Sequence, residues 1–358
     1  MPIADTSDRF SDFAPYAAAI DDAGAVAFQA TLAGGRTGIF TGSGGAVASR
    51  SERSKNAVTR FYSHPDIDHQ GASCVYGALA SGHEAILLLK DGAAISLADT
   101  SGPFKSIGPL GPTMNDHGTV VFRADTKSGR SGVFTTSSSG SIVTIADTSS
   151  FAGFQGLPVI TNKGTIVFRA DLSTGGHGIY LSRARGHGHE PVPEAVVETG
   201  ARFRTLGLFP CANNEDTVVF AATLIGGGAG IFRASNGDIR ANNGDIRARS
   251  GDVRAGDGDI RTIADTNSAF ESFRGALIND SGTVIFYATP RGGQLGIYAG
   301  AGADHVRDAV LSIGDPLFGS TVVELALNPV SINQRGQLAI RIRLANTRQL
   351  IVRADPAV

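Results

Sequence analysis

The chain has 358 residues and a net charge of −2; 42% of its residues are apolar, 18% are charged and 47 are glycine. This near-neutral balance argues against nucleic acid or an anionic membrane surface as a partner. No apolar run approaches the length of a membrane span, and the N-terminal MPIADTSDRF lacks the basic and apolar segments of a secretory signal. We therefore expect a soluble, cytoplasmic, monomeric protein that is rich in strands and turns.

One unit recurs along the chain, and its cleanest copy is NDHGTVVFRADTKSGRSGVF at residues 115–134. Asn115 and Gly118 suit a tight turn, and the β-branched and aromatic run at 119–122 favours a strand. A glycine-containing stretch then turns the chain into a partner strand at 132–134. Because the first run is apolar at consecutive positions, we expect it to be buried on both faces.

The turn residue before the apolar run recurs at intervals of roughly 50 residues. Its copies are Gly24, Gly71, Gly118, Gly164, Asp216, Gly282 and Gly336. A second element reads IADT or LADT at 3–6, 97–100, 145–148 and 263–266. We expect each of its aspartates to accept hydrogen bonds from the loop that follows.

Seven such units, each with four short strands, predict an all-β, seven-bladed β-propeller that spans residues 1–358 as one domain. Within a blade we expect the order inner strand, second strand, third strand and outer IADT strand. The chain begins with an outer strand and ends on a third strand. The N-terminal strand should therefore pair in the last blade, close the ring and leave no open edge there.

The repeat resembles that of the bacterial NxxGxxAF tandem-repeat proteins. DDAGAVAF at 21–28, followed by TGIF at 37–40, carries the resemblance, which extends over nearly the whole chain. It implies a propeller-like architecture and no particular activity.

Blade 2 departs most from the repeat, since its inner strand reads FYSHPDIDH at 61–69. His64 and Asp66 are two residues apart and would face the same way on a strand. Facing the central channel, they would form the acid–base pair of a catalytic site together with Tyr62, or ligate a metal. The alternative is a wetted channel lining, or two side chains that satisfy each other.

We call the top face the side of the blades formed by the loops that enter the inner strands and by the turns between second and third strands. Arg123 and Arg169 lie at the top-face end of their second strands, followed two residues later by Asp125 and Asp171. These charges form ion pairs between blades or, alternatively, a clamp for an anion at the channel mouth. The residues expected to bind a ligand at this mouth are Tyr16, Arg60, Arg123, Arg169 and Arg274.

Blade 5 contains a low-complexity insertion at 236–261, in which a seven-residue unit with GDIR or GDVR repeats. Calcium-binding β-roll repeats have nine residues, so we interpret the insertion as a tandem duplication that forms an extended hairpin or loop, or an interaction arm. His187, His189 and Glu190 in blade 4 are donors for a transition metal, although an exposed glycine-rich loop favours no binding.

The two cysteines, Cys74 and Cys211, fall three blades apart and are not expected to form a disulfide. The sequence contains no Walker A, CxxC, HExxH or GxSxG motif, and no cofactor or metal follows from it. It predicts a propeller that binds a small molecule or a protein at the top face and channel mouth. The alternative hypothesis is an enzyme that acts there on a small polar or anionic substrate, with His64 and Asp66 as acid–base pair and with or without a metal.

Overall fold

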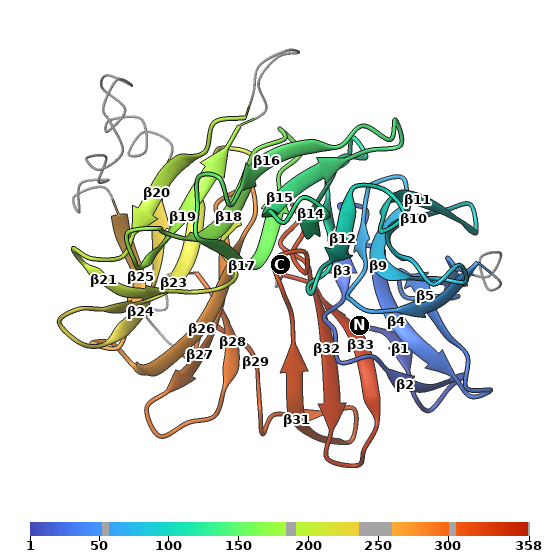
Figure 1. Cartoon of the computed structure of the whole chain (residues 1–358). Helices are drawn as coiled ribbons and strands as arrows, with labels where there is room; N and C mark the ends of the chain where they lie inside the picture. Colours follow the sequence, from blue (N-terminus) through green and yellow to red (C-terminus); the bar gives the residue numbers. More distant parts are fainter. Residues whose placement is uncertain (52–56, 184–190, 236–259, 301–305, 357–358) are drawn as a thin grey trace. The chain divides into compact units, whose positions relative to one another are not determined.

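The computed structural model describes residues 1–51, 57–183, 191–235, 260–300 and 306–356. These residues form strands and turns, with no helix among them, and the strands assemble into seven antiparallel sheets (Figure 1). The prediction of an all-β, seven-bladed β-propeller is confirmed. The chain divides into two compact units, Met1–Val143 with Ser312–Val358, and Thr144–Leu311. The histidine-containing loop at 184–190 and residues 236–259 of the insertion lie outside the described residues.

Blades 1 to 3 follow the predicted strand order from inner to outer strand. Blade 1 contains β2 (Phe10–Phe13), β3 (Ala19–Ile20), β4 (Val26–Leu32), β5 (Thr37–Gly42) and β6 (Ala48–Ser49). Blade 2 contains β7 (Val58–Phe61), β8 (Asp66–Ile67), β9 (Ser73–Leu79), β10 (Glu84–Lys90) and β11 (Ala93–Asp99). Blade 3 contains β12 (Phe104–Ile107), β13 (Thr113–Met114), β14 (Val120–Thr126), β15 (Ser131–Thr136) and β16 (Val143–Asp147).

Blades 4 to 6 repeat the pattern, and blade 7 combines both ends of the chain. Blade 4 contains β17 (Gly153–Ile160), β18 (Ile166–Asp171), β19 (His177–Ser182) and β20 (Glu194–Glu198). Blade 5 contains β21 (Phe203–Leu206), β22 (Cys211–Ala212), β23 (Val218–Leu224), β24 (Ala229–Ala234) and β25 (Ile260–Asp265). Blade 6 contains β26 (Phe270–Ile278), β27 (Val284–Pro290), β28 (Gly296–Ala299) and β29 (Ala309–Ser312). Blade 7 contains β30 (Pro316–Leu317), β31 (Ser320–Ala326), β32 (Leu338–Leu344), β33 (Gln349–Ala354) and β1 (Pro2–Asp5).

The inner strand is divided in two in blades 1, 2, 3 and 5, where its second part pairs separately with the same neighbour. A proline lies in each gap, and proline cannot donate a ladder hydrogen bond. These prolines are Pro15, Pro65, Pro109, Pro112 and Pro210. The gaps interrupt the sheet where the chain passes from the top face toward the opposite end, and they hold Tyr16, Tyr62 and His64.

The tight turn expected before each second strand is present, and a side chain of the turn itself closes it. The Asn115 carboxamide oxygen accepts the N–H groups of His117 and Thr119 at 3.1 and 3.0 Å. Gly118 has φ +74°, and Asp216, which replaces the glycine in blade 5, has φ +56°. This left-handed conformation explains why glycine dominates the position.

The aspartates of the outer strands cap the loops that follow them. Each accepts the backbone N–H two residues further on, at 2.8 to 2.9 Å. The four are Asp5, Asp99, Asp147 and Asp265. The expectation of a local capping role is confirmed.

The N-terminal strand completes blade 7, as predicted: β1 pairs antiparallel with β33 (Figure 1). The Met1 ammonium donates to the Arg353 carbonyl at 2.7 Å, and the Arg353 N–H donates to the Met1 carbonyl at 2.8 Å. Asp5 forms an ion pair with Arg348. Ile3 is 5% exposed, so apolar burial adds to these bonds.

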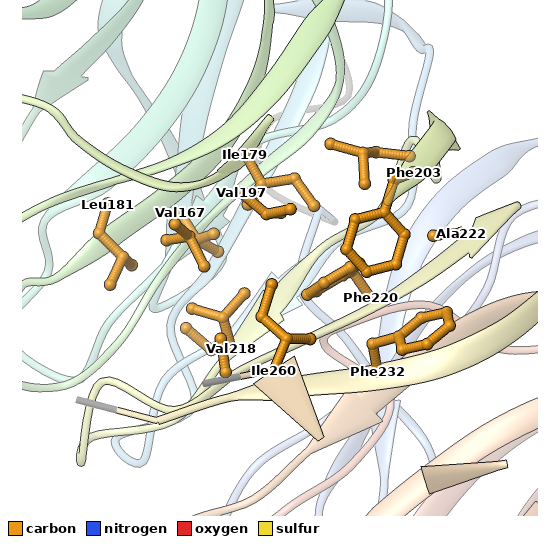
Figure 2. Packing of buried hydrophobic residues seen from close by; sticks show 14 of the residues in the cluster. Val167, Ile179, Leu181, Val197, Phe203, Val218, Phe220, Ala222, Phe232 and Ile260 are labelled. Carbon is orange, nitrogen blue, oxygen red and sulfur yellow. The ribbon is translucent and has the colours of Figure 1, made fainter. Parts of the chain in front are cut away.

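Blades 1 to 6 pack aromatic rings between their strands. In the second unit Phe203, Phe220 and Phe232 are almost fully buried, and the ring centroids of Phe203 and Phe232 lie 4.9 Å apart at an interplanar angle of 76° (Figure 2). Val167 and Ile179 of blade 4 belong to the same cluster. The consecutive apolar residues of each second strand are therefore buried on both faces, as expected.

The two cysteines are buried and free, one in each unit. Burial raises the pKa of the Cys211 thiol to about 11 and that of Cys74 well above its ordinary value. The prediction that they form no disulfide is confirmed.

Candidate ligand-binding site

A cleft of about 740 Å³ lies between blades 1 and 2 of the first unit. Turn residues 35 and 36, between β4 and β5, line it together with Thr37 at the start of β5, which places it at the top-face end of the two blades. The cleft brings together three of the residues predicted from the sequence, Tyr16, Arg60 and Tyr62. Ligand pockets usually measure about 300–1,000 Å³, so the cleft has the size of a small-molecule site.

Tyr62 forms one wall of this cleft, and its ring packs against a second tyrosine. Its N–H donates to the Tyr76 carbonyl at 2.8 Å, and the two ring centroids lie 5.1 Å apart. Burial and a hydrogen bond to Glu84 raise the pKa of Tyr76, which stays a neutral phenol. Gly108 of blade 3, at φ +94°, lies so close that a Cβ there would be 2.8 Å from the Tyr76 ring. Packing therefore fixes Tyr62 without any ligand.

Arg60 occupies a strand position at which the other six blades have no positively charged residue. It pairs in register with Ala78 on the second strand. The same register position in the other blades holds Asp12, Ser106, Gly153, Thr205, Ser272 and Glu324. Arg60 is exposed, its Cζ lies 5.6 Å from the Tyr62 ring centroid, and it makes no ion pair within the described residues. Blade 2 alone presents a cation at this position.

Gln29 on β4 also lines the cleft. Its Nε2 donates to the Phe61 carbonyl at 3.4 Å, a long bond, while its Oε1 is buried without a partner among the described residues. Because a carbonyl requires a donor, this bond fixes which amide atom faces the neighbouring strand. An unpaired buried acceptor costs about 1–3 kcal/mol, which a donor on a bound molecule would recover.

Two further charged residues line the cleft. Arg36 is exposed in the turn between β4 and β5. Asp12 lies on β2, and its carboxylate accepts the Nε2–H of Gln349 at 2.6 Å. Among the described residues, the cleft therefore contains two guanidinium groups and one carboxylate.

Asp66 lies outside the cleft, at the contact between blades 2 and 3. It is 5% exposed; its Oδ1 accepts the Ile67 N–H at 2.8 Å and its Oδ2 accepts the Met114 N–H of blade 3 at 2.7 Å. Burial raises the pKa of Asp66 to about 7. The carboxyl group thus links two inner strands through backbone hydrogen bonds.

His64 is buried beside it, 7% exposed, and faces blade 3. Its Nδ1 lies 3.2 Å from the Pro65 carbonyl, and its Nε2 has no partner among the described residues. A Cβ on Gly111 of blade 3 would lie 3.0 Å from this Nε2, so the glycine makes room for the ring. Burial lowers the pKa of His64 to about 4. No hydrogen bond joins His64 to Asp66 in the described structure, and the acid–base pair stays a prediction.

The remaining predicted binding residues do not line the cleft. Arg169 is 6% exposed, and its Nη1 lies 3.2 Å from Asp171 Oδ1 on the same strand. For this pair the interpretation of a bridge between blades is wrong, because a two-residue step brings both side chains to one face of β18. Arg123 is half-buried on β14, and Arg274 is exposed on β26.

Within the ranges that the structure describes, no three histidine, cysteine or carboxylate side chains gather as metal ligands. The same residues contain no helix of the length and hydrophobicity needed to span a membrane.

The fold defines this protein as a seven-bladed β-propeller, with a small-molecule-sized cleft between two of its blades. The chain belongs to a family of unknown function, DUF7453, whose family model matches residues 148–349. No curated protein matches it.

The chain is similar in structure to prolyl oligopeptidase B from Galerina marginata, with a TM-score of 0.60 and 11% identity over 97% of this chain and 50% of that one. It therefore spans about half the length of that enzyme. It is also similar to the BP39L lectin from Burkholderia pseudomallei, with a TM-score of 0.47 and 12% identity over 97% of each chain. Likeness at these identities concerns the fold alone, and the lectin's TM-score carries no argument.

Sequence reasoning missed Gln29 and Arg36 as lining residues. Arg36 had a usable signal, since it lies in a turn that defines the top face. Gln29 occupies the repeat position of Arg123 and Arg169, which drew attention to the arginines instead. Only the packing of blade 1 against blade 2 brings Gln29 and Arg36 next to Arg60.

Proposed function

We propose that this protein is a ligand-binding β-propeller and that the cleft between blades 1 and 2 is its binding site for a small polar molecule. The observation that carries the proposal is the meeting of Tyr16, Arg60 and Tyr62 in one cleft of about 740 Å³. Aromatic walls with a few polar groups that fix orientation are typical of small-molecule sites.

Support also comes from the way the cleft departs from the repeat. Arg60 stands where the corresponding strands of blades 1 and 7 carry the carboxylates Asp12 and Glu324. Tyr62 is held by Tyr76 before any ligand arrives, which lowers the entropy cost of binding. A structural role alone requires neither an exposed cation nor a supported aromatic wall at this place.

The proposal is tested by filling the cleft. Thr37 is exposed and lines it, so Thr37→Phe should occupy the space while keeping good strand propensity. Ala229 has the same register position in blade 5, outside the cleft, and has no side-chain hydrogen bond to lose. Ala229→Phe is therefore the control for a phenylalanine at this register position, while Thr37→Phe also removes the 3.3 Å hydrogen bond between the hydroxyls of Thr37 and Thr31.

Thermal-shift measurements on a panel of small polar molecules should give compounds that raise the melting temperature of the wild type and of Ala229→Phe but leave Thr37→Phe unchanged. Compounds that stabilise all three proteins equally would place binding elsewhere. Neither His64 nor Asp66 lines this cleft, so this experiment does not test them. The hypothesis of an enzyme with these two residues as acid–base pair stays a prediction.

A further inference from the structure

We propose that the ligand of this cleft is an organic anion, whose carboxylate or phosphate group is held by Arg60 and whose body offers a hydroxyl or N–H group to Gln29. The inference rests on the proposed binding function and adds the chemistry of the ligand.

The charges of the cleft favour an anion. Arg60 is exposed toward solvent, and among the described lining residues Asp12 is the acidic one. The carboxylate of Asp12 already accepts the Gln349 amide at 2.6 Å. A cationic ligand would meet the Arg60 guanidinium and a carboxylate that is already engaged, whereas an anion would gain the Arg60 guanidinium as a charge-assisted partner.

The placement of Arg60 suits recognition of an oxyanion. Its guanidinium carbon lies 5.6 Å from the Tyr62 ring centroid, and Tyr62 is itself packed on Tyr76. An interaction with the ring face restrains the guanidinium while its N–H groups stay available for a planar, two-oxygen acceptor. A lysine, with its point charge on a flexible stem, would supply less of this geometry.

The other polar residues of the cleft can form hydrogen bonds with both donors and acceptors on one ligand. The Gln29 Oε1 is buried and lacks a donor among the described residues, so a ligand donor would reach it when the amide turns and gives up the long 3.4 Å bond from Gln29 Nε2 to Phe61. The hydroxyls of Tyr16 and Tyr62 make no hydrogen bond within the described residues, so both are available to a ligand. An acid with a hydroxylated or N–H-bearing body satisfies these groups together, and a simple inorganic anion satisfies Arg60 alone.

The test measures binding of matched pairs of probes to the whole protein by isothermal titration calorimetry. The pairs are D-glucuronate with D-glucose, and 4-hydroxybenzoate with 4-hydroxybenzamide; inorganic phosphate is measured alone and distinguishes a phosphate site from a carboxylate site. The variants are Arg60→Gln and Thr37→Phe. Lys105→Gln is the control, because Lys105 is an exposed cation on the corresponding strand of blade 3 and does not line the cleft.

We expect an acid to bind more tightly than its neutral partner, and Arg60→Gln to weaken that acid by about 10- to 100-fold, the size of a charge-assisted hydrogen-bonded contact. Added salt should weaken the same binding, and Lys105→Gln should leave it unchanged. Thr37→Phe should abolish the binding of every probe that uses the cleft.

The outcomes separate the two proposals. One result would contradict the anionic ligand and leave the binding function in place. In that result the neutral probes bind as well as their acids, lose binding in Thr37→Phe and are unaffected by Arg60→Gln. Probes whose binding survives Thr37→Phe would overturn the site itself. If no probe binds at millimolar concentration, both proposals are contradicted.

Discussion

Replacing Asp66 with asparagine is expected to make the protein progressively more stable, relative to the wild type, as the pH rises from 4 to 7. Burial raises the pKa of Asp66 from 3.8 to about 7 in the fold, and the charges of Asp116 and Asp68 act in the same direction. Over this range the unfolded chain has lost the proton that the folded chain keeps, so the free energy of unfolding of the wild type falls with pH. A shift of about three pKa units corresponds to about 4 kcal/mol.

His64 acts with the opposite sign over nearly the same range. Burial lowers its pKa from 6.5 to about 4, so between these values the unfolded chain is protonated at His64 and the folded chain is not. The free energy of unfolding therefore rises with pH by about 3 kcal/mol from this group. In the wild type the contributions of His64 and Asp66 largely cancel, and single substitutions reveal each one.

The assay is urea unfolding of the wild type, Asp66→Asn and His64→Gln at several pH values from 4 to 8. The stability of Asp66→Asn minus that of the wild type should rise by about 4 kcal/mol from acid to neutral pH. A pH-independent loss of about 1–3 kcal/mol should accompany it, because an amide cannot accept both the Ile67 and Met114 N–H groups. The corresponding difference for His64→Gln should fall with pH.

Two results would refute this reasoning. Difference curves that do not change with pH would mean that burial does not shift the pKa of Asp66 or of His64. Curves of the opposite slope would mean that His64 and Asp66 form a charged pair in the fold, which would favour the acid–base hypothesis.

Three further predictions concern the packing of side chains in the blades. Gly111→Ala should destabilise the protein by about 1–3 kcal/mol in urea unfolding, because a Cβ there overlaps blade 2 side chains, whereas Gly275→Ala at the same repeat position meets open space and should be neutral. Ile3→Ala should cost about 2–5 kcal/mol, seen as a lower melting temperature, because β1 buries this side chain in blade 7; no change would mean that the N-terminal strand is not held there. Cys74 and Cys211 should react with a thiol reagent only after denaturation, and rapid labelling of the folded protein would contradict their burial.

The blades were predictable from sequence because their determinants are local. The turn that Asn115 closes and Gly118 permits is encoded within four residues, and even Asp216, which breaks the glycine pattern, adopts the left-handed conformation that the repeat requires. The pairing of β1 with β33 followed from counting strands per blade. The resemblance to NxxGxxAF repeat proteins stays a prediction.

The candidate site was only partly predictable, because it depends on contacts between blades. The sequence singled out Tyr16, Arg60 and Tyr62, but no spacing along the chain indicates that Gln29 shares a cleft with them. His64 was singled out as a residue that the other inner strands lack, but its packing where Gly111 of the next blade leaves space was not predicted. That relation becomes visible only when two inner strands are placed side by side.

The most direct test of the binding site is the electron density in the cleft of crystals soaked with the tightest-binding acid of the probe panel. We predict density between blades 1 and 2, with the acid's oxygens within hydrogen-bonding distance of Arg60 and a hydroxyl or N–H group directed at Gln29. An empty cleft in crystals that hold the same acid at another place would contradict the account.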